Sequence, residues 1–167
     1  MSSLEMIVLA LEAAAKLAVP VCLMHMQGQP ETMQEKPQYS DVTAEVRMFL
    51  SQRVDQCLQA GINMSNLILD PGFGFGKTKK QNFRLLNELD DIRVSGLPIL
   101  AGLSRKSMIG QTLGIEVNER LYASIALALL AMRNGASILR VHDVRETCEA
   151  IRMVEAVVTE KNERVQN

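Results

Sequence analysis

Four short apolar runs, spaced a few tens of residues apart, limit the fold of this 167-residue chain more than any other feature. Each run is rich in Val, Ile or Leu and ends in, or is followed by, a polar residue, without clean alternation of polar and apolar residues. This pattern is typical of parallel strands that are buried on both faces of a sheet. The runs are VPVCLMHM (19–26), LILD (67–70), LPILAGLS (97–104) and ILRVHD (138–143).

Segments with apolar residues at helical spacing lie before, between and after these runs. Asp41 is placed to cap one such helix and Gly61 to end it. Strands that alternate with helices predict an α/β chain with a parallel sheet, either doubly wound or an arc of a (β/α)8 barrel. A whole barrel takes about 250 residues, so four units would be a partial barrel. We expect helices over residues 3–18, 41–61, 80–96, 118–136 and 143–161.

The composition narrows the class of protein. With 47% hydrophobic residues, residues 1–167 are predicted to form a single domain with a substantial core. A net charge of -1 and 4% aromatic residues give no sign of binding to nucleic acid or membranes. Cys22, Cys57 and Cys148 form no C-x-x-C motif, and with two histidines in the chain a zinc site is not expected. Reduced thiols in a cytoplasmic protein are predicted.

The glycine-rich segment PGFGFGKT (71–78) ends like a phosphate-binding P-loop. That motif needs a glycine five residues before the glycine of GKT, and Pro71 stands there. Proline has no N–H to donate to an anion. The segment therefore predicts a glycine-rich loop at the end of a strand, with a role other than nucleotide binding.

Side chains near the ends of the first two runs suit a flat heterocycle. Asp70 could accept hydrogen bonds from the amino-N–C–N–H edge of a pterin or guanine, or it could order the glycine loop. Phe73 and Phe75 could cover a ring or anchor the loop to the core. Met24 and His25 point to opposite faces of their strand, so one should line the site and the other pack under helices.

The segment after the third run concentrates positive charge. Gly102 would let a ligand approach the backbone, and Ser104 could cap a helix whose N-terminus favours an anion. Arg105, Lys106 and Ser107 would then lie in the first turn, where basic residues oppose the helix dipole unless an anion binds. The alternative is a solvated basic turn.

In the fourth run, Ile138, Arg140 and His142 share one face of the predicted strand. A buried arginine is costly unless a counter-charge satisfies it. A phosphate held by Arg140 and His142 would do so. An ion pair from Arg140 to Asp70 or Asp143 would do so equally well.

Together these segments closely resemble the dihydropteroate synthase family of folate biosynthesis, the target of sulfonamides. The resemblance implies strands five to eight of a (β/α)8 barrel, preceded by a helix. It also implies an Mg²⁺-assisted transfer that joins dihydropterin-methyl diphosphate to para-aminobenzoate, giving dihydropteroate and diphosphate. The segments that carry it are VCLMHMQGQPETMQ, LILDPGFGFGKT, LAGLSRKSMIG and ILRVHD.

The resemblance also implies where the pterin would bind. Asp70 would hold its aminopyrimidine edge, Met24 and Gly102 would line its slot, and Arg140 would flank it. Lys106 would reach toward the pterin and its partner substrate.

The remaining implied roles concern para-aminobenzoate and the leaving group. Phe75 and Ser107 would hold para-aminobenzoate, Ser107 through its carboxylate. Arg140 and His142 would bind the leaving diphosphate, so Lys106, Arg140 and His142 are the predicted catalytic residues.

The resemblance does not extend to strands one to four, which in the family carry an asparagine associated with the metal, so no metal ligand is predicted in this chain. We expect an isolated monomer to be unstable or to associate, either as a homodimer or with a missing N-terminal half. A non-catalytic pterin- or diphosphate-binding remnant is the alternative. A pterin-dependent methyltransferase fits less well, because it has no diphosphate to bind.

Overall fold

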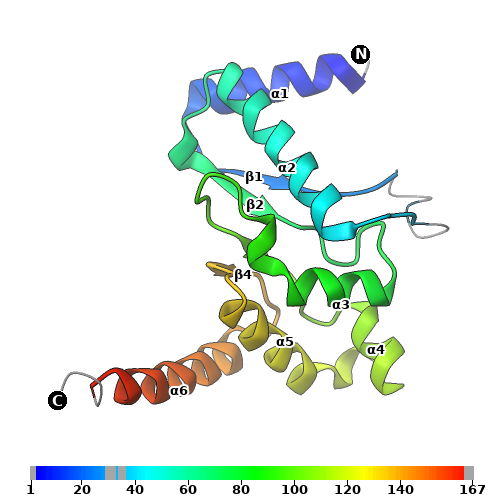
Figure 1. Ribbon diagram of the computed structural model, residues 1–167, viewed down its shortest axis with the longest axis vertical. Coiled ribbons are helices and arrows are strands. Elements are labelled where there is room, and N and C mark those ends of the chain that lie inside the picture. The colour runs from blue at the N-terminus through cyan, green and yellow to red at the C-terminus, as the bar shows by residue number, and fades with distance from the viewer. Residues whose placement is uncertain (1–2, 29–32, 34–36, 164–167) are drawn as a thin grey trace.

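The computed structural model describes residues 3–28, 33 and 37–163, which form a mixed α/β arrangement (Figure 1). Helices and strands alternate along the chain, as predicted. The strands are β1 (Val21–Met24), β2 (Leu67–Asp70), β3 (Leu100–Ala101) and β4 (Ile138–Leu139). The helices are α1 (Ser3–Leu17), α2 (Val42–Gln59), α3 (Lys79–Asn87), α4 (Ser107–Leu113), α5 (Leu121–Arg133) and α6 (Val144–Glu163), with short 3-10 turns at η1 (Met64–Asn66), η2 (Leu89–Ile92) and η3 (Val117–Glu119).

All strand pairs are parallel. β1 pairs with β2, placing Met24 opposite Asp70, and β3 pairs with β4. A single bridge between Leu69 and Ile99 connects the two pairs, supported by a 2.9 Å hydrogen bond from Leu69 N to Pro98 O. The strands therefore follow one another in space in their sequence order, and their carboxyl ends lie at one edge.

The third and fourth strands are shorter than predicted, and each contains only two residues of its apolar run. Arg140 and His142 consequently lie beyond β4, where both are exposed, although Arg140 N still donates to Ala101 O at 3.0 Å. The prediction that Arg140 is buried inside a strand is wrong. Its guanidinium needs no counter-charge to compensate for burial.

The cap prediction for α2 is confirmed. The Asp41 side chain accepts hydrogen bonds from Thr43 N and Ala44 N, and Gly61 follows the helix with a positive φ of 85°. The helix predicted over residues 80–96 is interrupted, since α3 ends at Asn87 and η2 follows. The 3-10 turn places residues three apart on one side, so Leu89 and Ile92 both reach the core. The segment 118–136 is similarly divided between η3 and α5.

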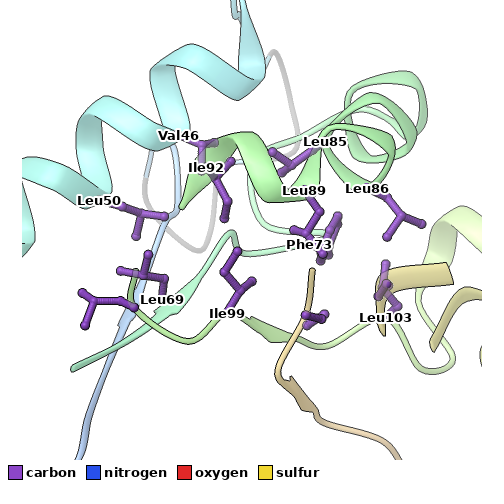
Figure 2. Packing of buried hydrophobic residues seen from close by; sticks show 14 of the residues in the cluster. Val46, Leu50, Leu69, Phe73, Leu85, Leu86, Leu89, Ile92, Ile99 and Leu103 are labelled. Atoms are coloured by element: carbon purple, nitrogen blue, oxygen red, sulfur yellow. The ribbon is translucent and has the colours of Figure 1, made fainter. Parts of the chain in front are cut away.

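The core lies between the strands and the helices α2 and α3. Val46 and Leu50 of α2 face Leu69 of β2 and Ile99, which immediately precedes β3, in Figure 2, and all four side chains are fully buried. Leu85 and Leu86 of α3, with the η2 residues, close the same cluster. α1 packs against this cluster through Leu11, Ala14 and Ala15, whereas α6 extends away from it (Figure 1). Within the described ranges, no helix has the length and apolarity needed to cross a membrane.

Candidate functional site

Three charged side chains gather at the carboxyl edge of the strands. Asp70 ends β2, Lys106 precedes α4 and Arg140 follows β4. Burial raises the pKa of Asp70, against the opposing effects of the Gly72 N–H and of the positive charges of Arg140 and Lys106. Burial also lowers the pKa of Lys106, and Arg140 lowers it further, while Asp70 acts in the other direction. The charges of the three groups therefore act on one another.

A cleft of about 480 Å³ opens between the loops that follow β3 and β4. Positive charge dominates it, which suits an anion with several oxygens. Of the predicted site residues, Met24, Asp70, Phe75 and Ser107 do not line this cleft. The lining residues are Gly102, Ser104, Arg105, Lys106, Val117, Arg140, Val141 and His142.

Gly102 leaves room for the Arg140 side chain. A Cβ built on Gly102 would lie 2.6 Å from Nη2 of Arg140 and 3.0 Å from its Cζ. The space that the sequence assigned to a ligand is thus filled by the guanidinium in this structure. The glycine places Arg140 directly against the backbone of the loop after β3.

Ser104 does not cap a helix, because α4 begins three residues later at Ser107, with Lys106 as a cap that makes no side-chain hydrogen bond. Ser104 is buried instead, and its Oγ lies 2.9 Å from Nδ1 of His142. The same oxygen accepts a 3.3 Å hydrogen bond from the backbone N of His142. This serine orients the imidazole at the mouth of the cleft.

Arg105 is paired with a carboxylate. Its Nη2 lies 2.6 Å from Oδ1 of Asp143 and its Nε 3.2 Å from Oδ2. Its backbone has a positive φ of 57°, and its N–H donates to Ser124 Oγ at 2.9 Å. Asp143 therefore pairs with Arg105, and no ion pair among the described residues involves Arg140. The alternative of an ion pair from Arg140 to Asp70 or Asp143 is wrong, and so is the placement of Arg105 in a helical first turn.

Lys106 lies over the Phe75 ring, with Nζ 4.3 Å from the ring centroid. Phe73 is fully buried in the core, so the two phenylalanines of the glycine loop have different surroundings. Phe73 anchors the loop, and Phe75 is the aromatic ring beside the charged site. The ammonium gains a cation–π contact in a position that is half-buried.

Met24, the last residue of β1, and His25, which follows it, point to opposite faces of the strands. Met24 is 38% exposed, whereas His25 is 5% exposed. The His25 ring packs edge to face with Phe49 of α2, with the two ring centroids 4.9 Å apart. Met24 pairs in register with Asp70. Met24 thus lies on the open face of the strands and His25 under the helices, which was the expected division.

Sequence reasoning missed one buried charge in this region. Lys77 is 3% exposed, and its Nζ lies within 3.1 Å of three polar atoms of the protein. The signal was present in the GKT motif, which draws attention to this lysine, but the motif suggests a phosphate as its partner. The structure turns Lys77 inward.

Comparisons with known proteins agree with this geometry. The model of the family described as "Pterin binding enzyme" matches residues 4–142. The chain is 55% identical over 152 residues to the dihydropteroate synthase of Escherichia coli (strain K12). The matched region covers 91% of this chain and 54% of that protein.

Solved structures give the same result. The dihydropteroate synthase of Yersinia pestis, in complex with a sulfonamide drug, superposes with a TM-score of 0.87 at 49% identity over 90% of this chain and 55% of the other. The enzyme of Xanthomonas albilineans, solved with 4-aminobenzoic acid, gives a TM-score of 0.82 at 47% identity over 89% of this chain and 52% of the other.

The chain spans about half the length of the curated relatives it matches, and that half is the C-terminal one. The matched residues include every strand and each charged side chain of the cleft, since they run from the first helix to His142. This chain belongs to the pterin-binding enzyme family, in which it corresponds to the C-terminal portion of dihydropteroate synthase.

Proposed function

We propose that this chain supplies the C-terminal half of a dihydropteroate synthase site. The reaction would condense 6-hydroxymethyl-7,8-dihydropterin diphosphate with para-aminobenzoate to give 7,8-dihydropteroate and diphosphate. The observation that carries the proposal is the electrostatic coupling of Asp70, Lys106 and Arg140, which come from the ends of three consecutive strands. The 4-aminobenzoic acid bound to the relative from X. albilineans supports the second substrate.

The four strands would be strands five to eight of a (β/α)8 barrel. Their parallel pairing and sequential order support this assignment. Within the described residues the outer edges of β1 and β4 have no partner strand. A partner that supplies strands one to four, or a second copy of this chain, would pair with these edges.

Asp70 would recognise the pterin. A carboxylate at a buried rim can accept two parallel N–H bonds from an aminopyrimidine edge. Met24 and Gly102 would line the slot and Arg140 would flank it. Since burial raises the pKa of Asp70, donors on the pterin would favour its charged form and lower that pKa on binding.

Arg140 and His142 would hold the diphosphate. In the reaction the amine nitrogen forms a bond to the pterin methylene carbon as the bond from that carbon to the diphosphate oxygen breaks. The electron pair leaves with the diphosphate, and the amine loses a proton to solvent. Two fixed donors at the departing oxygens stabilise this developing charge.

Lys106, Phe75 and Ser107 would position para-aminobenzoate. The half-buried ammonium of Lys106 lies over the Phe75 ring, lines the cleft and is influenced by the charge of Asp70. Ser107, at the start of α4, is exposed and would bind the substrate carboxylate. Positioning of the two substrates supplies much of the rate in such condensations.

The described residues do not fit the expected Mg²⁺ site. Among the described residues, no three or more His, Cys, Asp or Glu side chains gather where they could hold a metal ion. The side chains around the cleft are mainly donors and cations, whereas Mg²⁺ prefers oxygen ligands. The roles proposed for these side chains do not depend on the metal.

A location in the cytoplasm stays a prediction from the sequence.

The activity test measures incorporation of para-aminobenzoate with Mg²⁺, for the chain alone and after addition of a fragment that carries strands one to four. We expect activity in the mixture. Size-exclusion chromatography should show association of the chain alone, and a cooperative monomer would count against that prediction. Diphosphate binding without activity in either sample would favour the non-catalytic remnant.

Arg140→Ala tests the diphosphate site directly. Because Arg140 has no ion pair among the described residues, the change should weaken diphosphate binding about tenfold or more, measured by isothermal calorimetry. Arg152→Ala removes an exposed arginine of α6 and is the matched control. Unchanged affinity in Arg140→Ala would contradict the assignment.

A further inference from the structure

Each of the three residues of the GKT motif, 76–78, has a contact within the protein. A Cβ on Gly76 would lie 2.5 Å from Gln27 O, so only glycine fits there. Thr78 caps α3 in a reciprocal capping box with Gln81. Lys77, between them, is buried and points away from the cleft, whose lining does not include it.

The ammonium of Lys77 is fully satisfied by the protein. It donates to Gly72 O at 2.9 Å and to Phe75 O at 3.1 Å, and it lies 2.9 Å from Nδ1 of His25. An ammonium has three donors and no acceptor, so Nδ1 must accept and the neutral His25 ring carries its proton on Nε2. The lysine thus joins the end of β1 to two carbonyls of the glycine loop, residues 71–77.

The charged and titratable groups around Lys77 come from three elements. They are His25 after β1, Asp70 at the end of β2 and Lys106 before α4. Burial is the main cause that lowers the pKa of Lys77 to about 7, opposed by Asp70 and reinforced by Lys106. Burial of an ammonium costs free energy, and the hydrogen bonds of Lys77 to the loop carbonyls offset part of that cost.

The opposite side of the glycine loop forms part of the proposed site. Phe75, whose carbonyl Lys77 holds, places its ring 4.3 Å from Nζ of Lys106. A Cβ on Gly74 would lie 3.2 Å from Cδ of Lys106, so the lysine lies directly on the loop. Asn82 fixes the same segment, because its Oδ1 accepts from Gly74 N at 2.8 Å and its Nδ2 donates to Lys77 O at 3.2 Å.

We propose that Lys77 is a positioning residue, which holds the carbonyls of Gly72 and Phe75 so that the Phe75 ring stays against Lys106. The inference rests on the proposed function for its consequence, namely that this contact orients the aromatic amine. Lys77 itself touches neither substrate. It acts from inside the loop on the ring and the ammonium that do.

Fluorine NMR on the 167-residue chain tests the placement without any ligand. Fluorophenylalanine replaces the four phenylalanines, and the Phe75 resonance is assigned by its loss in Phe75→Leu. Lys106→Met then gives the shift caused by loss of the ammonium. Lys77→Met keeps the length of the side chain but removes all three contacts, and Lys80→Met, on the exposed side of α3, is the matched control.

We expect Lys77→Met to displace the Phe75 resonance and to make it insensitive to the further change Lys106→Met. Lys80→Met should leave both properties unchanged. A Phe75 resonance in Lys77→Met that keeps its wild-type position and its full response to Lys106→Met would overturn the proposal. If Lys77→Met fails to fold by circular dichroism, Lys77→Arg decides, since the wider guanidinium cannot reproduce the three contacts and an unmoved resonance would again overturn it.

Calorimetric titration with para-aminobenzoate, in the assembly that carries activity, tests the consequence. Lys77→Met should weaken binding about tenfold, with Lys80→Met unchanged. Equal affinity of wild type and Lys77→Met would overturn the role in orienting the amine. If the wild type does not bind para-aminobenzoate but the Phe75 resonance moves as expected, the proposed substrate is wrong and the positioning of the ring by Lys77 stands.

Discussion

Helices α2 and α6 are similar in length, with 18 and 20 residues, but they differ in what covers their apolar side chains. In α2, Val46 and Leu50 are completely buried against the strands. In α6, Met153 and Val157 are each 67% exposed. Figure 1 shows the same contrast, because α2 crosses the strands and α6 extends away from them.

The difference follows from how each helix is attached. In the first turn of α6, Val144 is 60% exposed, but Thr147 is buried and its Oγ donates to Asp143 O at 2.7 Å. Asp143 in turn forms an ion pair with Arg105 in the loop after β3. The start of α6 is therefore fixed by the loops of the site, whereas the rest of the helix makes few contacts with the core. The side of α2 that faces the strands is buried, whereas α6 leaves large apolar side chains exposed from Val144 to Val158.

Truncation of one apolar side chain in each helix should show the contrast most strongly. Leu50→Ala empties a fully buried position and should lower the free energy of unfolding by about 2–5 kcal/mol. Met153→Ala, at an exposed position, should change it by less than about 0.5 kcal/mol. Urea unfolding followed by circular dichroism measures both. A large loss in Met153→Ala would mean that another copy or segment covers α6 in solution.

Protonation of His25 should weaken the α2 side of the molecule in acid. Burial and the Lys77 ammonium lower the pKa of this ring from 6.5 to about 4. Because the unfolded chain takes up the proton first, the neutral ring contributes its full stability above about pH 6.5. Stability should then fall by roughly 3 kcal/mol as the pH drops to about 4.

The pH effect of His25 can be separated from that of the carboxylates. His25→Gln retains an acceptor for Lys77 but cannot titrate, so urea unfolding between pH 4 and 7 is compared for the two proteins. The wild type should lose stability more steeply on acidification than His25→Gln. Parallel curves would show that the buried ring and its lysine partner do not set the acid response.

The sequence could predict the features that local patterns determine, but not those that depend on neighbours in space. The parallel strands, the Asp41 cap and the gathering of Asp70, Lys106 and Arg140 follow from local patterns, because the ends of parallel strands meet at one edge. The short length of β4 depends on its neighbours in space. No periodicity in the run 138–143 indicates where its pairing stops.

Contacts between segments far apart in the sequence could not be predicted either, because they also depend on neighbours in space. Arg105 and Asp143 are 38 residues apart, and Lys77 and His25 are 52 apart. Each pair depends on how two loops approach one another, and the positive φ of Arg105 shifts the start of α4 past Ser104. A sequence pattern can supply a charge, but the fold decides which partner it meets.

The smallest expected effect compares two ion pairs, one that joins Asp143, just before α6, to the loop after β3, and one on the exposed surface of α6. Arg105 and Asp143 form a bidentate pair with side chains 35% and 17% exposed, whereas Arg145 and Glu149 are 85% and 61% exposed. Exposed pairs contribute little to stability, because water screens them and ordering long side chains costs entropy.

A double-mutant cycle to alanine on each pair measures this difference. The melting temperature should show a coupling of a few degrees for Arg105 and Asp143 and none for Arg145 and Glu149. Because the first pair also joins the two loops of the cleft, Asp143→Ala should weaken diphosphate binding, and Glu149→Ala should not. Equal coupling in the two pairs would mean that the contact from Asp143 to Arg105 fixes the start of α6 no better than an exposed pair on the helix surface does.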